Sequence, residues 1–357
     1  MTTTLAEYTT LGLGGPAETF IVASREADLL SAVRTADAAC DPLLLIGGGS
    51  NLVIADDGFP GTVIHVNTRG AGYRQAADTD AAGAGAAVEV TVAAGEDWDS
   101  VVAATAAEGL AGLESLSGIP GRAGATPIQN VGAYGREVAE VITRVRVYDR
   151  REDRIQVIPN ERCSFTYRSS LFKSAGARYV VLDVTFALAR KALSLPVRYA
   201  ELAAELGVEM GERAGVGEVR SAVLKIRARK GMVLNPGDPD TRSAGSFFTN
   251  PVIGTDELAR VEAAAMARAA GQVPRYEAGT GLVKLPAAWL IEHAGFARGH
   301  GAPGPARLSS KHTLALINAG DATTAELLTL AREIVSGVRA AFGVTLTAEP
   351  VLVGVTL

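Results

Sequence analysis

The hydrophobic positions of this chain repeat with two different periods. Helical patterns, with apolar residues three or four positions apart, predict helices at 26–39, 99–108, 218–230, 256–270, 287–293 and 324–342. Short apolar runs predict strands at 42–46, 52–55, 62–66, 88–93, 141–148, 155–158, 179–187, 313–318 and 351–355.

Two stretches between these elements follow neither period. Residues 76–87 are rich in Ala, Gly and Asp, which predicts a loose surface connection. Residues 236–243 are rich in Pro, Gly and Asp, which predicts a domain boundary. We find no internal repeat.

Length, composition and charge limit which class of protein this chain can be. A chain of 357 residues with 48% hydrophobic residues is expected to form two or three domains. It has no run of membrane-spanning length and no secretion-signal pattern, so we expect a cytoplasmic protein. A net charge of −5 argues against nucleic acid as a partner. Cys40 and Cys163 are expected to be buried free thiols, and the four histidines lack the spacing of a zinc site, so no metal is expected.

Residues 118–135, called here the glycine-rich loop, are the most informative part of the chain. They contain five glycines and two prolines, which exclude a regular helix or a central strand. Ile119, Ile128, Val131 and Tyr134 nevertheless give the segment apolar anchors. An ordered, nearly uncharged loop that exposes its backbone groups suits a flat, polar, hydrogen-bonding ligand.

A second stretch, residues 47–51, is called here the glycine run, and it follows an apolar strand. Its backbone N–H groups favour phosphate binding. The dinucleotide fingerprint would need a third glycine where Leu52 stands and a helix afterwards, whereas a strand is predicted here. A plain tight turn is the alternative interpretation.

Three single residues carry candidate chemistry. Arg168 can hold a carboxylate or stabilise an enolate through two parallel hydrogen bonds, or it is a surface arginine at a strand edge. Ser246 lies beside two phenylalanines without a histidine or a nucleophile elbow, so its hydroxyl is a candidate proton donor to carbon, or else a turn serine. Glu349 is a candidate acid or polarising group, or an exposed turn glutamate.

Taken together, these motifs resemble the UDP-N-acetylenolpyruvoylglucosamine reductase family, the flavoenzymes of peptidoglycan precursor synthesis, in the subgroup with an extra tyrosine loop. The resemblance covers nearly the whole chain, and its specific parts are 47–51, 118–135, 167–173, 230–236, 245–251 and 284–292. It implies that NADPH reduces FAD and that the flavin then reduces the enolpyruvyl group of the UDP-sugar to give UDP-N-acetylmuramate. Arg168 would stabilise the developing negative charge, Glu349 would polarise the substrate carboxylate, and Ser246 would protonate the second carbon.

The resemblance also implies a fold and its domains. We expect an α+β protein with a two-subdomain FAD-binding fold of the vanillyl-alcohol-oxidase (PCMH) type and a C-terminal α/β substrate-binding domain. The first subdomain would span 1–70 with the C-terminal strand 349–357, the second 71–230, and the substrate domain 240–348. We expect a monomer with a small-molecule substrate and no membrane partner.

The resemblance assigns further residues to ligands. It implies FAD contacts at Gly47, Gly48, Gly49, Ser50, Asn51, Ser117, Ile119, Pro120, Gly124, Ala125, Ile128, Val131 and Gly132. It implies substrate contacts at Tyr199, Lys230, Asn250, Tyr276, Arg298 and His312. The chain departs from the family pattern at Thr249, Arg298, His312 and Val351, which affects the expected diphosphate contacts.

Two other functions are compatible with parts of this pattern. Another FAD oxidase of the same fold would keep both glycine segments but has no need of Ser246 together with Glu349. Covalent flavin attachment usually needs a histidine or cysteine at the flavin, and neither glycine segment contains one. A binding protein without activity is the other alternative, and the presence of all three proposed catalytic residues argues against it.

Overall fold

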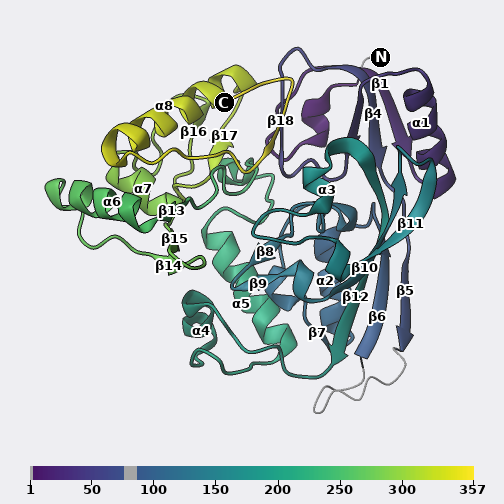
Figure 1. The fold of residues 1–357 in the computed structure, drawn as a ribbon, viewed down its shortest axis with the longest axis horizontal. Coiled ribbons are helices and arrows are strands. Elements are labelled where there is room, and N and C mark those ends of the chain that lie inside the picture. Colours follow the sequence, from purple (N-terminus) through teal and green to yellow (C-terminus); the bar gives the residue numbers. More distant parts are fainter. Residues whose placement is uncertain (1–2, 76–86) are drawn as a thin grey trace. The chain divides into compact units, whose positions relative to one another are not determined.

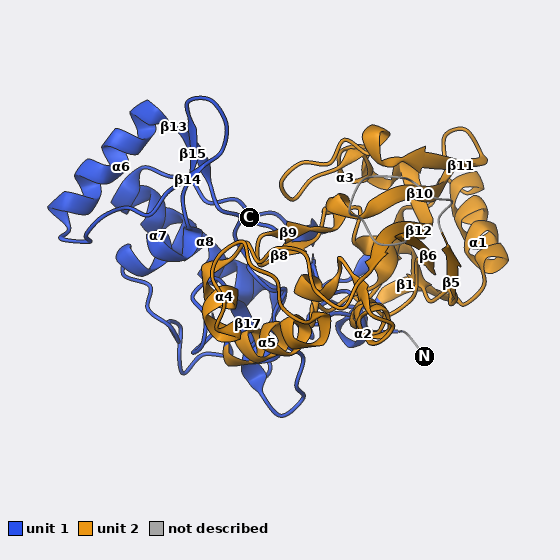
Figure 2. Ribbon diagram, turned by 90° about the horizontal axis from the view of Figure 1, so that it is seen from below, with its two compact units in different colours: residues 1–16, 49–59, 230–357 blue, residues 17–48, 60–229 orange. Residues whose placement is uncertain are grey.

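The structure, a computed structural model, describes residues 3–75 and 87–357 and divides into two compact units (Figure 2). Unit 1 comprises Met1–Pro16, Gly49–Phe59 and Lys230–Leu357, and unit 2 comprises Ala17–Gly48 and Pro60–Arg229. The expected first domain, 1–70, is therefore shared between the two units. The functional assignment of three domains stays a prediction.

Unit 2 is built on a six-stranded sheet with the order β11-β10-β12-β6-β5, to which β7 adds by pairing with β12 (Figure 1). All of its strand pairs are antiparallel. Its strands are β5 (Ala71–Gln75), β6 (Ala87–Ala93), β7 (Leu110–Ala111), β10 (Ile142–Asp149), β11 (Arg154–Pro159) and β12 (Tyr179–Arg190).

The two faces of β6 show why this sequence forms a sheet. Val88, Val90 and Val92 alternate with less buried residues, so one face of the strand joins the large core of unit 2. On the other face Glu89 accepts hydrogen bonds from Arg144, which lowers the pKa of its carboxyl to about 2 with help from Arg74.

A smaller sheet of unit 2 carries the glycine run at the end of one strand. Its order is β1-β4-β2, and β2 and β4 are parallel. Helix α1 packs on β1 and β2. The elements are β1 (Ala17–Ala23), α1 (Glu26–Ala38), β2 (Leu43–Ile46) and β4 (Phe59–Val66).

The remaining elements of unit 2 surround the glycine-rich loop. Helix α2 begins where Asp97 accepts a hydrogen bond from the Ser100 N–H, and Gly109 follows its end in the left-handed conformation. Helices α4 and α5 share a small apolar core that also includes Tyr134. These elements are α2 (Trp98–Ala107), β8 (Gly132–Ala133), β9 (Arg136–Glu137), α3 (Leu171–Ser174), α4 (Ala200–Leu206) and α5 (Val216–Arg229).

Unit 1 is organised around its longest helix, α8 (Thr324–Phe342), which packs against α6, α7 and β16. Thr323 and Glu326 form a reciprocal cap at its start, and Gly343 ends it in the left-handed conformation. Strand β18 pairs in parallel with β3. The other elements are β3 (Leu52–Ile54), β13 (Val252–Gly254), α6 (Thr255–Ala267), β14 (Tyr276–Glu277), β15 (Leu282–Lys284), α7 (Ala287–His293), β16 (Ala306–Leu308), β17 (Leu316–Asn318) and β18 (Val351–Val353).

The predicted helices and strands are confirmed, with ends that differ by a few residues. The predicted connection at 76–87 lies outside the described residues, apart from Ala87. The expectation for the cysteines is half wrong. Cys163 is buried, which raises its pKa to about 12, but Cys40 is exposed because the chain turns there after α1 with a φ of 55°.

Candidate functional site

The glycine run and the glycine-rich loop meet in unit 2. A Cβ atom on Gly48 would lie 2.7 Å from the Gly121 Cα, and one on Gly47 would lie 3.2 Å from the Arg122 Cβ and Cγ. The two backbones therefore approach as closely as glycine allows. Gly47, Gly48 and Gly121 stay half-buried, which leaves part of this backbone surface accessible.

The glycine-rich loop rests on the core of unit 2 through its apolar anchors, as predicted. Ile119, Ile128 and Val131 are partly buried against the large core. Gly124 is buried, and a Cβ there would lie only 2.5 Å from the Ala94 Cβ. Of the other expected cofactor contacts, Pro120 is half-buried, Ala125 is exposed, and the fully buried Ser117 donates its hydroxyl to the Glu114 carbonyl at 2.7 Å.

Arg168 lies against the far end of the same loop. Its guanidinium donates to the Gly132 carbonyl at 2.7 Å and to the Asn130 carbonyl at 3.4 Å. Its backbone has a φ of 54°, which is costly for a residue with a side chain and is typical of functional positions. Arg168 is half-buried in a turn, so the alternative of an ordinary strand-edge arginine does not describe its setting.

Further hydrogen bonds connect the turn that carries Arg168 to the glycine-rich loop. The buried Asn130 donates to the Thr166 carbonyl at 3.0 Å and to the Glu137 carboxylate at 2.7 Å. Ser170 donates to the Ile128 carbonyl at 2.7 Å and also caps α3. These contacts hold the Arg168 segment and the loop in one fixed arrangement.

The start of the glycine-rich loop is held by Asp99 of α2. Its carboxylate accepts from the Gly118 N–H at 2.6 Å and from two nitrogens of Arg220 at 2.6 and 2.9 Å. Burial works to raise the pKa of Asp99, but the hydrogen bonds from Arg220 and Gly118 outweigh it, so the pKa lies below its ordinary value.

Replacing Asp99 should therefore cost stability in a pH-dependent way. A group whose pKa is lowered by folding stabilises the protein above the unfolded pKa, about 3.9, and this contribution is lost as the pH falls through the folded value. We expect Asp99→Asn to lower the free energy of unfolding by about 1–2 kcal/mol at pH 7, because a charged acceptor is lost from a partly exposed site.

Urea unfolding at several pH values, followed by tryptophan fluorescence, measures this effect. The difference between wild type and Asp99→Asn should shrink below about pH 4. Asp57→Asn, at an exposed position, is the matched control. A difference that stays constant down to pH 3 would rule out the charge of Asp99 as the cause.

Unit 1 brings Ser246 and Glu349 onto neighbouring backbone segments. The Glu349 N–H donates to the Phe247 carbonyl at 2.9 Å, and Phe248 and Ala348 form an antiparallel bridge. Ser246 and Glu349 are both half-buried beside the fully buried Phe247 and Phe248 rings. Neither residue therefore has the exposed setting of an ordinary turn.

The last part of the glycine run lies beside Glu349 in the same unit. The Asn51 side-chain amide donates to the Glu349 carbonyl at 3.5 Å, and the Val351 N–H donates to the Asn51 carbonyl at 2.9 Å. Gly49 is buried, and a Cβ there would lie 1.8 Å from the Tyr8 carbonyl oxygen, so no side chain fits. Arg168 belongs to unit 2, and its convergence with Ser246 and Glu349 stays a prediction.

The expected substrate residues of unit 1 occupy different local settings. Asn250 is committed in part to the fold, because its side-chain oxygen accepts from the Ala287 N–H at 2.9 Å, where α7 begins. Tyr276 is exposed and pairs with Lys284 between β14 and β15. Lys230 is half-buried, Arg298 is exposed, and the His312 N–H donates to the Ser309 hydroxyl at 3.3 Å.

Tyr199, the expected substrate residue of unit 2, contacts the glycine-rich loop. It is exposed, and its ring meets the Tyr134 ring edge-on with centroids 5.4 Å apart. Burial raises the pKa of Tyr134 to about 12, so Tyr134 stays a neutral hydroxyl at physiological pH. The Tyr134 ring therefore supports the exposed Tyr199 ring through an edge-on aromatic contact.

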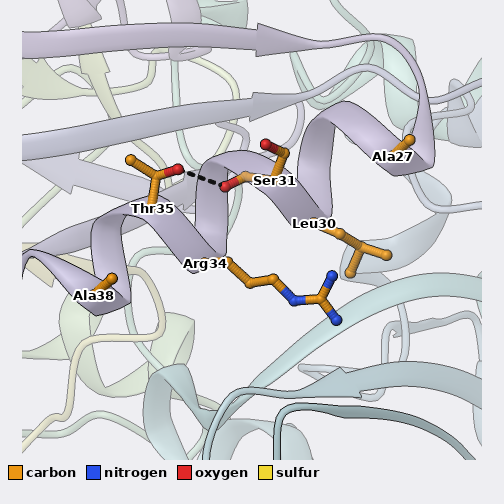
Figure 3. A pocket seen from close by; sticks show the side chains of 6 residues that line it. All are labelled: Ala27, Leu30, Ser31, Arg34, Thr35 and Ala38. Atoms are coloured by element: carbon orange, nitrogen blue, oxygen red, sulfur yellow. Dashed lines mark hydrogen bonds between the residues drawn. The ribbon is translucent and has the colours of Figure 1, made fainter.

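A shallow hollow along α1 is not the candidate site. It is lined by one helix alone, and Figure 3 shows its six residues, which are Ala27, Leu30, Ser31, Arg34, Thr35 and Ala38. None of them is a predicted site residue. Within residues 3–75 and 87–357, no group of three His, Cys, Asp or Glu side chains could hold a metal ion, and no helix is long and apolar enough to cross a membrane.

Known proteins match this chain over both parts of the expected architecture. The profile of an FAD binding domain matches residues 17–157, and the profile of the UDP-N-acetylenolpyruvoylglucosamine reductase C-terminal domain matches residues 238–353. The reductase of this name from Thermobifida fusca is 54% identical over 99% of this chain and 97% of its own length. The chain belongs to the UDP-N-acetylenolpyruvoylglucosamine reductase family.

Two further comparisons agree with this family. The reductase from Streptomyces coelicolor is 54% identical over 99% of this chain and 90% of its own length. The crystal structure of the Thermus caldophilus reductase superposes with a TM-score of 0.63 at 25% identity and covers 99% of this chain and 98% of its own. The expected α+β architecture, an FAD-binding part followed by the C-terminal domain of the family, is confirmed.

The residues of unit 2 fit an FAD molecule. Gly47 and Gly48 leave half-buried backbone beside Arg122 and Gly121, where any Cβ would collide, and the Arg122 Nε is buried there without a hydrogen bond. Sequence reasoning missed Arg122. The signal was present, because it is the only charged residue between positions 118 and 135.

Proposed function

We propose that this protein reduces UDP-N-acetylglucosamine enolpyruvate to UDP-N-acetylmuramate with NADPH and FAD, and so supplies peptidoglycan synthesis. The observation that carries this proposal is family membership over essentially the full length, through both the FAD-binding and the C-terminal parts. The activity makes the protein an FAD-dependent oxidoreductase with roles in cell wall formation, cell shape and division.

FAD, when bound, supplies the two-electron chemistry that links NADPH to the substrate. We assign its diphosphate to the glycine run and its ring system to the glycine-rich loop. The absence of Cβ atoms lets a ligand approach the backbone amides closely. The anchored loop then holds one geometry, which limits the reorganisation needed when the ligand binds.

Arg168 and Glu349 act on the substrate carboxylate in this proposal. Reduction at the methylene carbon places negative charge beside the carboxylate, and the fixed guanidinium of Arg168 stabilises that charge. Its positive-φ turn and its bonds to the loop carbonyls support this role, because they fix its position before substrate binds. Glu349 hydrogen-bonds to the substrate carboxylate and polarises it, and the two carboxyl groups must share one proton in this contact, since an ionised carboxylate only accepts.

Ser246 delivers the proton that completes the reduction. Its hydroxyl gives a proton to the second carbon of the enolpyruvyl group, so that each carbon of the former double bond gains one hydrogen. The buried Phe247 and Phe248 beside it restrict water, which favours a proton from a positioned side chain.

The UDP part of the substrate is assigned to the polar residues that match the family's substrate contacts. Lys230, Tyr276, Arg298 and His312 offer positive charge or hydrogen bonds, and Tyr199 offers its ring and hydroxyl. Asn250 would use its NH₂ group, because its oxygen accepts from Ala287. We further propose a cytoplasmic monomer that needs neither membrane nor nucleic acid, since both substrates are small polar molecules.

Steady-state assays test this function. NADPH should be oxidised only when the enolpyruvyl UDP-sugar is present, with one product molecule per NADPH and a product mass higher by two hydrogens. UDP-N-acetylglucosamine, which lacks the enolpyruvyl group, is the matched control. Purified protein that contains no flavin after denaturation, or NADPH oxidation independent of the sugar, would contradict the proposal.

A further inference from the structure

Arg122 occupies the contact between the glycine run and the glycine-rich loop. Its Cβ and Cγ cover Gly47, while its neighbour Gly121 covers Gly48, at the distances given above. Its position in the sequence, alone among uncharged residues, puts one fixed positive charge at the point where the two glycine segments meet.

The backbone on both sides of Arg122 is held by hydrogen bonds. The Trp98 N–H donates to the Gly121 carbonyl at 3.1 Å, and the Ala123 N–H donates to the Glu96 carbonyl at 2.9 Å. The backbone of Arg122 also forms an isolated antiparallel β-bridge with the backbone of Asp97. The Arg122 side chain therefore leaves a fixed backbone, with its Cβ and Cγ beside Gly47.

The charge of Arg122 is poorly compensated within unit 2. Its Nε is buried without a hydrogen-bond partner, and no carboxylate of the described residues lies within ion-pair distance of its guanidinium. Burial and the nearby charge of Arg69 both lower the pKa of Arg122, and the carboxylates of Asp97 and Glu96 offset this only in part. An arginine remains protonated even so, because its ordinary pKa is above 12.

The neighbouring cations strengthen the positive potential at this point. Arg69 donates to the Gly95 carbonyl at 2.7 Å and lies 3.4 Å from a Glu96 oxygen, so it is held in place. Burial, followed by the charges of Arg122 and Arg69, lowers the pKa of His65, although a hydrogen bond to the Gly47 backbone works in the opposite direction. The charges of two arginines thus act on one histidine next to the glycine run.

We infer that Arg122, supported by Arg69, binds the diphosphate of FAD where the glycine run meets the glycine-rich loop. This inference rests on the proposed function for the presence of FAD. A diphosphate brings negative charge and several acceptor oxygens, which match a guanidinium with a buried, unsatisfied N–H. Backbone N–H groups of the glycine run add donors that carry no charge.

Flavin affinity tests the inference directly. Full-length protein stripped of flavin is titrated with FAD, with ADP and with riboflavin, and binding is followed by flavin fluorescence or calorimetry. We expect Arg122→Ala to weaken FAD and ADP about 10- to 100-fold, since one charge-assisted hydrogen-bond donor is lost. Riboflavin has no phosphate, and its affinity should change less than about twofold. Arg122→Lys should recover part of the loss, because it restores the charge without the fork of donors.

Arg154→Ala is the matched control, since Arg154 is an exposed arginine of β11 in the same unit. The FAD affinity of wild type should also fall with added salt more steeply than that of Arg122→Ala.

Equal weakening of riboflavin and FAD would show a general effect on folding and overturn the inference. Unchanged FAD affinity would overturn it too. A defect confined to NADPH binding would also overturn it, because Arg122 would then bind the 2′-phosphate of NADPH instead of the diphosphate of FAD. Wild-type protein that binds no FAD would instead refute the proposed function.

Discussion

Ser246→Ala should leave the first half of the reaction intact and block the second. NADPH should still reduce the bound flavin at close to the wild-type rate, because Ser246 takes no part in that step. Reduction of the enolpyruvyl sugar should slow by about 10²- to 10⁴-fold, the usual contribution of a positioned proton donor. This split follows from the place of Ser246 in unit 1, beside Phe247 and Glu349 rather than on the glycine-rich loop.

Stopped-flow absorbance under anaerobic conditions separates the two halves. Flavin reduction is followed after mixing with NADPH, and flavin reoxidation is followed after mixing the reduced protein with substrate. Ser221→Ala, which changes an exposed serine of α5, is the matched control and should behave as wild type in both. Normal reoxidation in Ser246→Ala would show that another group supplies the proton.

Arg168→Ala should lower kcat for sugar reduction by about 10²- to 10³-fold, the range found when a preorganised donor to a developing negative charge is removed. Arg168→Lys should recover only part of this loss, since lysine restores the charge but not two parallel N–H donors. Arg168 also donates to the Gly132 carbonyl, so a moderate loss of flavin affinity is expected in addition.

The two contributions can be told apart by measuring at saturating FAD. There the loss in kcat should persist, because it reflects charge stabilisation in the transition state. Arg162→Ala, which changes an exposed arginine of the preceding turn, is the control. If saturating FAD restores full turnover to Arg168→Ala, the arginine serves only to hold the loop.

Much of the fold could be predicted because it is encoded locally. The alternation of valines in β6 and the glycines that end α2 and α8 are signals within a few residues. Strand β5 could not be predicted in the same way, because all of its residues are exposed and the run carries no apolar face. Strands β14 and β15 also escaped prediction, because neither contains an apolar run as long as the one at 52–55.

In the candidate site, too, features encoded by neighbouring residues could be predicted, and contacts between distant residues could not. Both glycine segments were evident from composition, and Ser246 and Glu349 were found from motifs of a few residues. The contact of Gly48 with Gly121 and the pairing of Phe247 with Glu349 join positions far apart in the chain, which no local pattern encodes. Arg122 stands out locally as the one charged residue of the glycine-rich loop, but its contact with the glycine run is not encoded locally. Its significance depends on Gly47, which lies far away in sequence.

One anaerobic titration tests the central claim most directly. The protein as purified should be yellow, and about one equivalent of NADPH should bleach the flavin absorbance. One equivalent of the enolpyruvyl UDP-sugar should then restore the oxidised spectrum in the absence of oxygen, with UDP-N-acetylmuramate as the product. A flavin that is reduced by NADPH but is reoxidised only by oxygen, and not by the sugar, would contradict the account and favour an oxidase instead.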